Sequence, residues 1–591
     1  MQNTWNLELL YKDLEDPQIK EDIQKSIEEN KKFVEKWKNN KGYLEKPEIM
    51  LEALTDYENL MQNYGLCTKP SYYYSLLFYL DQTNTDIKAR INKLDDITTD
   101  LENNIQFFSL SISKIPEEKQ KIFLDSPLLQ KYHHMLETSF ASGKYVLSDK
   151  EEKILNITYN TSYENWVEML STLLDKQKTT VKNEDGKEVD ISYNEISKYL
   201  DSKKKDVRNY ASSQFNKVNE KYLEIAEYEM NSVLEHKKSR DKVRNYAKPE
   251  LATLVSDDIE PEIVDSLVSA VTDNFDISQQ YYKYKAKMLG QKTLGYHERN
   301  VPIAEDVNKE YTYDNAQQLV EESFRKLDEE FYNIVKSFYD NGQYDVFPKQ
   351  GKYGGAFCVS VGKNLPTYIL LNHTNTVDDV LTIAHESGHG IHTELSKSQS
   401  ELNCDYPISL AEIASTFFEG YVLDDIISMA SQEEKISLYN QKLNRDISTI
   451  FRQIAFYNFE KDLHKDYREK GFLDKDYICN LFAKHMNAYL GDAVDTDTAM
   501  KLGWIYVGHF RRYFYVYSYA SGLLIAKSLL ELVKEDKKNV EKVKMFLSSG
   551  STKSPRDLFN SIGIDITKKE FWMKGINSIR NDMKLLDLDS N

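Results

Sequence analysis

Residues 385–392 read HESGHGIH, and this octapeptide constrains the local fold because its chemistry requires a helix. On a helix, His385 and His389 leave the same face about one turn from each other. Two imidazole nitrogens placed in this way can each reach one tetrahedral metal ion at roughly 2.0–2.1 Å. Glu386 follows the first histidine, and its carboxylate can take a proton from a bound water. The pattern predicts a helix that supplies half of a zinc site.

The flanks of the motif agree with a helix. Thr376 and Asp379 have the spacing of a capping box, in which each residue's side chain bonds the other's backbone N–H. An apolar stripe leads from there into the histidines: Val377, Val380, Leu381, Ile383 and Ala384. We therefore expect the metal helix to begin just after Thr376.

A catalytic zinc ion usually takes three protein ligands and one water, so a third ligand is needed. His392 shares the helix face but lies seven residues from His385, about 10 Å along the axis. The longer H-E-x-x-H-x-x-G-x-x-H pattern requires glycine at position 392 and histidine at position 395. This chain has His392 and Leu395, so the third ligand must come from another element.

A second predicted helix offers two carboxylates. It follows Pro407, with Ser409 as its N-cap and Glu412 three residues later. Glu412 could complete a capping box with Ser409 or bind the metal. Glu419 lies two turns further on the same face, and it could be the ligand instead or orient a ligand histidine. Helical spacing leaves both assignments open.

The segment 509–522, HFRRYFYVYSYASG, is unusually rich in neutral hydrogen-bond donors. Its imidazole and phenol groups are those of His509, Tyr513, Tyr515, Tyr517 and Tyr519. Such donors can stabilise an oxyanion beside a metal ion. A buried aromatic helix whose hydroxyl groups are satisfied locally is the alternative interpretation.

Composition narrows the class of protein. The 591-residue chain has a net charge of −19, which disfavours a nucleic-acid partner because phosphate binding needs a basic face. No window approaches the roughly 20 apolar residues of a membrane span, and the N-terminus lacks the features of a signal peptide. We therefore expect a cytoplasmic protein without a membrane partner. Four widely spaced cysteines suggest neither disulfides nor a thiolate zinc site.

Most of the chain has helical periodicity, with two β-like interruptions. Residues 179–192 read TTVKNEDGKEVDIS, in which Asp185-Gly186 is a hairpin turn signal. We place a domain boundary just after it, between an N-terminal helical lobe (1–193) and a catalytic domain (194–591). Residues 344–372 predict two or three short strands immediately before the metal helix. Within them, Gly354 and Gly355 permit another backbone to approach closely.

The motifs, taken together, resemble a known family. WNLELLY, GKYGGAFC, YILLN, HESGHGIH, AEIASTFFEG and HFRRYFYVYSYASG occur in the order found in oligoendopeptidase F, the bacterial branch of the thimet oligopeptidase family of zinc metallopeptidases. The resemblance covers nearly the whole chain. It implies a mainly α fold, with two helical lobes enclosing a deep channel and a small β-sheet next to the zinc-binding helix.

The resemblance also implies roles for individual residues. One Zn²⁺ per chain would be held by His385, His389 and Glu412, because the family's third ligand opens an E-x-x-S pattern and Ser415 completes it here. Glu386 would be the general base. The remaining implied contacts to the peptide are the backbone of Gly354, Gly355, Ala356 and Phe357, and the side chains of His509 and Tyr517, with Tyr515 as second choice. His297 stands where the family usually has an acid, so a role for that acid does not carry over.

The implied function is hydrolysis of internal bonds of short peptides by zinc-activated water. A zinc carboxypeptidase of similar helical fold is the nearest alternative, in which Arg511 or Arg512 would bind the C-terminal carboxylate. A helical binding protein with a vestigial metal site is a further alternative, and the intact Glu386 argues against it. The sequence does not indicate an oligomeric state.

Overall fold

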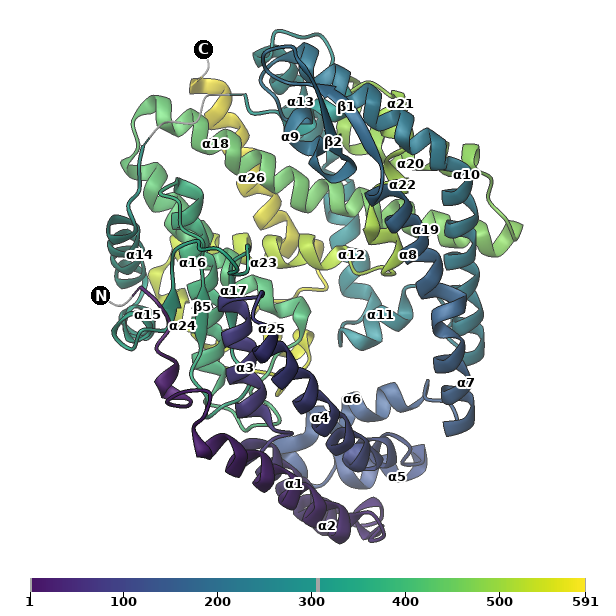
Figure 1. Ribbon diagram of the computed structural model, residues 1–591, viewed down its shortest axis with the longest axis vertical. Helices are drawn as coiled ribbons and strands as arrows, with labels where there is room; N and C mark the ends of the chain where they lie inside the picture. The colour runs from purple at the N-terminus through teal and green to yellow at the C-terminus, as the bar shows by residue number, and fades with distance from the viewer. Residues whose placement is uncertain (1–2, 304–308, 590–591) are drawn as a thin grey trace. The chain divides into compact units, whose positions relative to one another are not determined.

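The computed structural model describes residues 3–303 and 309–589, apart from the side chains of residues 149, 408, 409 and 587–589. The fold is mainly helical with two small sheets, as Figure 1 shows. The predicted fold class is therefore confirmed, while the enclosed channel stays a prediction. None of the helices in the described part of the chain combines the length and apolar composition that crossing a bilayer requires.

Contacts divide the chain into two compact units, each assembled from three segments. Unit 1 comprises Met1–Lys144, Asn308–Ser428 and Leu529–Asp565, and unit 2 comprises Tyr145–Val307, Met429–Ser528 and Ile566–Asn591. The predicted boundary at residues 193–194 concerns functional domains and stays a prediction. The compact units follow a different division, because distant segments of the chain pack together within each unit.

Unit 1 packs N-terminal helices around an apolar core. Its helices are α1 (Pro17–Trp37), α2 (Pro47–Asn63), α3 (Thr68–Leu80), α4 (Thr85–Ser113), α5 (Glu117–Leu124), α6 (His133–Gly143), α14 (Tyr313–Leu327), α15 (Glu329–Asp340), α16 (Val377–Ser396), α17 (Ile408–Met429), α24 (Val540–Leu547) and α25 (Pro555–Ser561). In α1, the buried positions 19, 26, 30, 33 and 37 recur at helical spacing, so one face meets the core.

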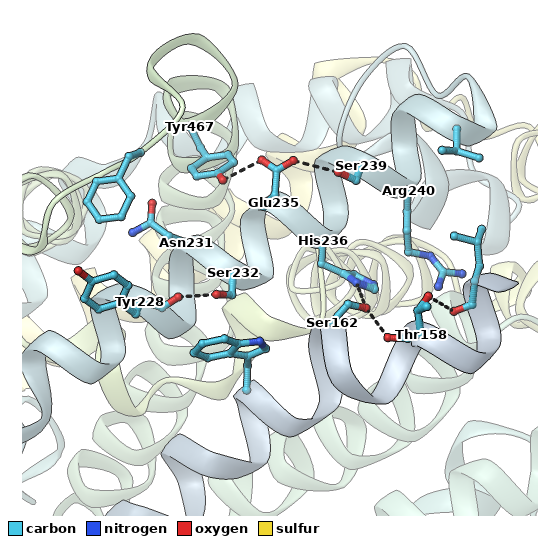
Figure 2. A pocket seen from close by; sticks show the side chains of 14 residues that line it. Thr158, Ser162, Tyr228, Asn231, Ser232, Glu235, His236, Ser239, Arg240 and Tyr467 are labelled. Carbon is cyan, nitrogen blue, oxygen red and sulfur yellow. Dashed lines mark hydrogen bonds between the residues drawn. The ribbon is translucent and has the colours of Figure 1, made fainter.

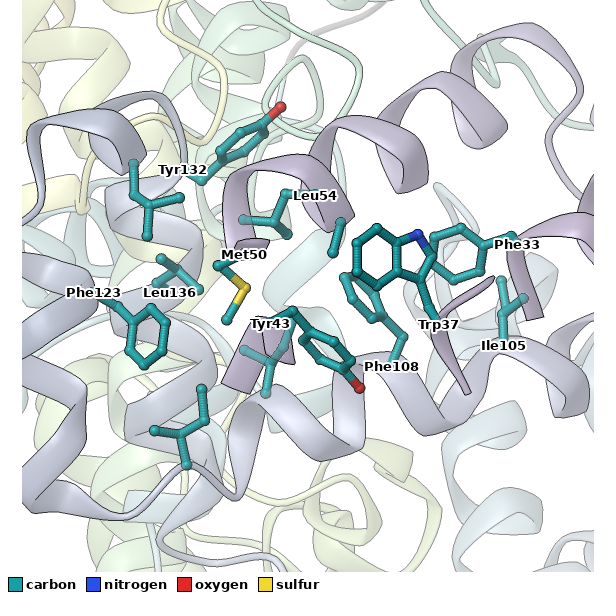
Figure 3. Close-up of a cluster of buried hydrophobic side chains, with 14 of the residues drawn as sticks. Phe33, Trp37, Tyr43, Met50, Leu54, Ile105, Phe108, Phe123, Tyr132 and Leu136 are labelled. Carbon is teal, nitrogen blue, oxygen red and sulfur yellow. The ribbon is translucent and has the colours of Figure 1, made fainter. Parts of the chain in front are cut away.

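The core of the N-terminal helices is an aromatic and aliphatic cluster, shown in Figure 3. Phe33 meets Phe108 edge-on at 5.3 Å, and Trp37 meets Tyr43 edge-on at 5.9 Å. Leu136 of α6 is fully buried in the same cluster. These contacts join α1, α4 and α6 into one packed body.

A three-stranded sheet precedes α16, as the sequence predicts. It contains β3 (Tyr344–Asp345), β4 (Phe357–Val359) and β5 (Tyr368–Leu370) in the order β3-β5-β4. β3 is parallel to β5, and β4 is antiparallel to it with Cys358 opposite Ile369. The Tyr344 and Ser387 hydroxyls are hydrogen-bonded at 2.7 Å, which fixes the sheet against α16. β4 is therefore an edge strand held beside the metal helix.

Unit 2 is also helical and carries the predicted hairpin. Its elements are α7 (Asp149–Tyr159), α8 (Asn165–Asp175), β1 (Lys178–Lys182), β2 (Glu188–Ser192), α9 (Ser197–Leu200), α10 (Lys205–Arg244), α11 (Leu251–Ser256), α12 (Pro261–Thr272), α13 (Phe275–Met288), α18 (Gln432–Asp446), α19 (Arg452–Lys470), α20 (Lys475–Leu490), α21 (Thr498–Lys501), α22 (Gly503–Tyr506), most of α23 (Tyr517–Glu535) and α26 (Lys569–Asp589). The hairpin is confirmed, with Val181 opposite Val189 and Gly186 at φ +76° in the turn.

We expect Leu136→Ala to lower the free energy of unfolding of unit 1 by about 2–5 kcal/mol, because it leaves a cavity in the core cluster. Urea unfolding followed by tryptophan fluorescence measures the change, since Trp37 lies in that cluster. Leu128→Ala is the matched control because Leu128 is 48% exposed, and its effect should stay within about 0.5 kcal/mol. Equal effects of the two substitutions would contradict this account of the core.

Candidate functional site

Helix α16 presents the two histidines as predicted. The Thr376 side chain accepts a hydrogen bond from the Asp379 backbone N–H, and the Asp379 carboxylate accepts one from the Thr376 backbone N–H. The predicted capping box is confirmed, and it starts the helix nine residues before His385. The His385 and His389 rings lie 5.0 Å apart at an interplanar angle of 83°. Both ring edges are thus on one helix face.

Glu412 of α17 lies beside both imidazoles. Its Oε2 is 3.5 Å from Nε2 of His385 and 3.8 Å from Nε2 of His389. Zinc with tetrahedral ligands at roughly 2.0–2.1 Å would place those ligand atoms about 3.3–3.4 Å from one another. One ligand atom from each of the three residues lies within 4.8 Å of the others. Two imidazoles and one carboxylate at this spacing fit a zinc ion.

A close approach of two helices delivers Glu412 to this position. A Cβ on Gly388 would lie 2.9 Å from Cα of Ser415 and 3.1 Å from the carbonyl oxygen of Ala414. Only glycine at position 388 lets α17 come so near α16. The buried Ser415 hydroxyl then donates to Oε2 of Glu412 at 3.0 Å and restrains the carboxylate.

The structure separates the roles that the sequence left open for the two glutamates. Nδ1 of His385 donates to Oε2 of Glu419 at 3.0 Å. With the proton on Nδ1, the lone pair of Nε2 points toward Glu412. Glu419 therefore orients His385, while Glu412 lies with the candidate ligands. The Ser409 side chain that would cap α17 lies outside the described residues.

Glu386 is 7% exposed and lies next to the edge strand. Burial raises the pKa of Glu386 to about 7, and the charge of Glu412 adds to that rise. His385 and the backbone N–H of Cys358 lower the pKa, and the latter donates to the Glu386 carboxylate. Since Cys358 is the central residue of β4, the carboxylate lies against that strand.

The segment predicted to contact the substrate, residues 354–357, lies only partly in a β-strand. Phe357 begins β4, whereas Gly354, Gly355 and Ala356 form the bend before it. A Cβ on Gly354 would meet no atom within 4 Å, so the space around that residue is open. The Gly355 carbonyl accepts from the Asn372 side chain at 2.7 Å. Among the described strands, only β5 pairs with β4, and the N–H of Cys358, its central residue, is engaged by Glu386.

His509 and the tyrosines that follow it lie in unit 2. A turn connects them in which Tyr513 has φ +46° and Phe514 has φ +61°, unusual for non-glycine residues. The buried Glu460 carboxylate accepts the Phe514 backbone N–H at 2.8 Å and supports this turn. The turn places Tyr515 beside His509, where the Tyr515 hydroxyl is hydrogen-bonded to Nδ1 of His509. Strained backbone of this kind is common at functional sites.

Tyr517, the preferred candidate from the sequence, points elsewhere. It is fully buried, and its hydroxyl donates to Oδ2 of Asp257 at 2.6 Å. Tyr515 is partly exposed and bonded to His509. The proton of the Tyr517 hydroxyl is thus used in the bond to Asp257, and which of the two tyrosines contacts a peptide stays a prediction.

The arginines invoked for a carboxypeptidase differ in availability. Arg511 is 4% exposed and bonds both oxygens of Glu229, at 2.9 and 2.8 Å. Its guanidinium also donates to two backbone carbonyls. Arg511 thus supports the His509 turn and has no donor group left for a peptide terminus. Arg512 is exposed.

A cavity of about 580 Å³ in unit 2 contains none of the predicted residues (Figure 2). The Glu235 carboxylate accepts from Tyr467 and Ser239, each at 2.9 Å. His236 is hydrogen-bonded to Ser162 at 3.0 Å. The main polar groups that line this cavity are thus hydrogen-bonded to one another.

The chain matches two family models. Residues 198–578 match the model described as peptidase family M3, and residues 112–175 match the one described as oligopeptidase F. The chain belongs to peptidase family M3, and it is a metalloendopeptidase. The resemblance inferred from the motifs is confirmed.

Similar curated proteins agree with this membership. Oligopeptidase PepF of Bacillus subtilis is 26% identical over 96% of this chain and 84% of its own length. An oligoendopeptidase F homolog of Borreliella burgdorferi is 27% identical over 88% of each chain.

Solved structures show the same fold. A peptidase from Chlamydophila abortus has a TM-score of 0.88 at 24% identity, covering 100% of this chain and 98% of its own. Oligoendopeptidase-F from Enterococcus faecium has a TM-score of 0.70 at 20% identity, covering 97% and 98%.

Sequence reasoning missed several residues on which the site depends. Gly388 makes the helix crossing against the backbone of Ser415, a contact that the E-x-x-S pattern does not reveal, and Glu460 supports the turn after His509. The small residues at positions 388 and 415 were a usable signal, since small residues let helices approach closely. Glu460 gave no signal, because its partner lies 54 residues away.

We expect Gly388→Ala to weaken zinc binding roughly 10–100-fold, comparable to the loss of a residue that supports a metal ligand. The added methyl group would push α17 and Glu412 away from the histidines. Zinc titration against a competing chelator measures the affinity. Gly354→Ala is the matched control, since its methyl group meets no atom within 4 Å. Unchanged zinc affinity of the Gly388 variant would show that the crossing does not set the ligand geometry.

Proposed function

We propose that this metalloendopeptidase is zinc-dependent and hydrolyses internal bonds of short peptides. The observation that carries the proposal is Oε2 of Glu412 at 3.5 and 3.8 Å from the two histidine Nε2 atoms, beside the buried Glu386. His385, His389 and Glu412 would hold one Zn²⁺ per chain. Zinc bound there would polarise the scissile carbonyl and lower the pKa of a water molecule towards about 7.

Glu386 would act as the general base. Its carboxylate would take a proton from the attacking water and deliver it to the leaving amine. Two features support this role. The side chain is held at the edge of β4 by the Cys358 backbone N–H, and burial keeps its proton affinity higher than that of an exposed glutamate.

An extended peptide fits the geometry of β4. A peptide that runs along the edge of β4 that is not paired with β5 would lie against Cys358, whose N–H donates to the Glu386 carboxylate. The open space at Gly354 would let the peptide backbone continue past the strand. A folded protein offers no such extended segment, so short, flexible peptides are the expected substrates.

Tyr515 would donate its hydroxyl proton to the developing oxyanion, while its oxygen accepts the Nδ1–H of His509, which would hold the hydroxyl in place. Their mutual hydrogen bond and the supported turn at Tyr513 and Phe514 hold the pair in one orientation. Preorganised donors are effective because they do not reorganise during the reaction. Tyr517 would be structural through its bond to Asp257.

Turnover of an internally quenched peptide, with and without a chelator, tests the proposed function. We expect cleavage at an internal bond, its loss on zinc removal and its return when zinc is restored. Glu386→Gln should abolish turnover while about one zinc per chain remains, because Glu386 moves a proton and is not a ligand. Asp378→Asn, an exposed acid on the same helix, should behave as wild type. Loss of zinc from the Glu386 variant would overturn its role.

Substitution of the tyrosines separates the two candidates. Tyr515→Phe should lower kcat roughly a hundredfold or more with little change in KM, because the donor acts mainly in the transition state. Tyr517→Phe should instead lower stability, by breaking the buried bond to Asp257, and leave kcat of the folded protein near normal. Steady-state kinetics and thermal unfolding of both variants decide the matter. A loss of kcat in Tyr517→Phe together with a near-normal kcat in Tyr515→Phe would assign the oxyanion contact to Tyr517.

A further inference from the structure

Two arginines of unit 2 lie in a tyrosine-rich cluster that the proposed function does not use. We name it the two-arginine cluster: Arg299 and Arg452 with Tyr282, Tyr296, Tyr489 and Tyr506. Although the chain carries a net charge of −19, this cluster is locally positive. Such a local excess calls for an explanation, because unpaired charge away from bulk water is costly.

Arg299 is held in place by tyrosines. Its guanidinium stacks on the Tyr296 ring, 3.6 Å from the centroid, and donates to the Tyr296 carbonyl. The side chain is also hydrogen-bonded to the Tyr506 hydroxyl. Part of the residue remains exposed, so a ligand can reach it.

Arg452 begins α19 directly after a π-helical turn, Ile447–Phe451, a feature often found at functional sites. Its guanidinium lies 5.8 Å from the Phe456 ring. Its Nε is buried without a hydrogen-bond partner, and so is the hydroxyl of the fully buried Tyr489. Two unsatisfied donors in one cluster indicate a missing acceptor.

Both arginines act on the same tyrosines. Burial raises the pKa of Tyr282 to about 12, and the charges of Arg299 and Arg452 each oppose that rise. The same two charges act on Tyr489 and Tyr506. The guanidinium groups therefore surround one shared set of phenols.

Neighbouring acids do not neutralise the cluster. Glu298 is engaged by Arg208 at 2.6 Å, and Asp497 caps α21 by accepting the Met500 backbone N–H. Asp201 acts on Arg299 only at longer range than an ion pair. Within residues 3–303 and 309–589, neither Arg299 nor Arg452 forms an ion pair.

Three other arginines of unit 2 do have carboxylate partners. Arg208 pairs with Glu298, Arg468 with Asp241 and Arg511 with Glu229, at 2.6, 2.6 and 2.8 Å. Arg299 and Arg452 differ from these three in having no such partner among the described residues.

The two-arginine cluster adjoins His509. The Phe456 ring lies between them, 6.1 Å from the His509 ring and 5.8 Å from the Arg452 guanidinium. Burial lowers the pKa of His509, and the Arg452 charge lowers it further. A ligand on Arg452 would thus lie near the residue expected to contact the scissile carbonyl.

We propose that Arg299 and Arg452 bind a carboxylate of the peptide substrate, with the Tyr489 and Tyr506 hydroxyls as further donors. Guanidinium groups suit this task because their paired N–H donors match the two carboxylate oxygens. The carboxylate can be the C-terminus of the peptide or an acidic side chain. The inference rests on the proposed peptidase function and names a substrate class for it.

The test uses three peptides of one sequence and the zinc-loaded enzyme. The first peptide ends in a free carboxylate, the second in an amide, and the third in an amide with one glutamine replaced by glutamate. We expect kcat/KM to be at least about tenfold higher for a peptide with a carboxylate. The first and third peptides identify which carboxylate source the enzyme uses.

Arg452→Met should abolish this preference, measured as the ratio of kcat/KM for an acidic peptide to kcat/KM for the neutral peptide. Arg452→Lys should restore part of the preference, because the charge returns without the paired donors. Arg299→Met should also reduce the preference for a peptide that carries a carboxylate. Arg512→Met is the matched control, since the exposed Arg512 also lies near His509, and it should keep the full preference.

Three outcomes would overturn the inference. The preference could be absent in the wild type, could survive both Arg452→Met and Arg299→Met, or could vanish only in Arg512→Met. Equal losses for all three peptides would assign Arg452 to support of His509 instead. If the wild type cuts no peptide, the proposed function fails, and equilibrium binding of the acid and amide peptides then tests the arginines separately.

Discussion

The close crossing of α16 and α17 is the contact on which the metal site depends. A side chain at Gly388 would collide with the backbone of Ser415, so the distance between the helices is set by the absence of a single methyl group. α16 is also held from other sides. Tyr344 bonds Ser387, and Gly390 packs against the Phe338 ring of α15, where a Cβ would come within 2.6 Å. With the helix fixed in this way, the distances from Glu412 to the histidines follow from helical geometry.

Local sequence predicts the metal site well because the relevant spacings lie within single helices. The i, i+4 histidines, the Thr376–Asp379 box and the E-x-x-S pair Glu412 and Ser415 each join residues no more than four positions apart. The choice between Glu412 and Glu419 needed the resemblance. Spacing puts both on one face, and only the structure shows Glu419 behind His385. The short strands and the hairpin were also predictable, since glycine turns and β-branched runs mark them locally.

Sequence does not show side-chain orientations that depend on long-range partners. Tyr515 and Tyr517 look equivalent along the chain, yet Tyr517 is engaged by Asp257, 260 residues away. The turn that precedes both tyrosines has positive φ at Tyr513 and Phe514. Because neither residue is glycine, the sequence gives no signal for this turn. Its support comes from Glu460 on α19. The division into two compact units does not follow the order of the chain, because each unit joins three separate segments.

Each unit provides groups that suit a ligand of opposite charge. In unit 1, Glu412 and two neutral imidazole nitrogens converge, and Glu419 and Ser415 hold them, which suits a cation. In unit 2, His509 and Tyr515 offer neutral donors next to two unpaired guanidinium groups, which suits an anion. Both preferences match the proposed hydrolysis, in which negative charge develops on the carbonyl oxygen while the carboxylates of the peptide are already charged. The strained turn at Tyr513 is then a consequence of function, since a relaxed helix through 509–522 would not turn Tyr515 back onto His509.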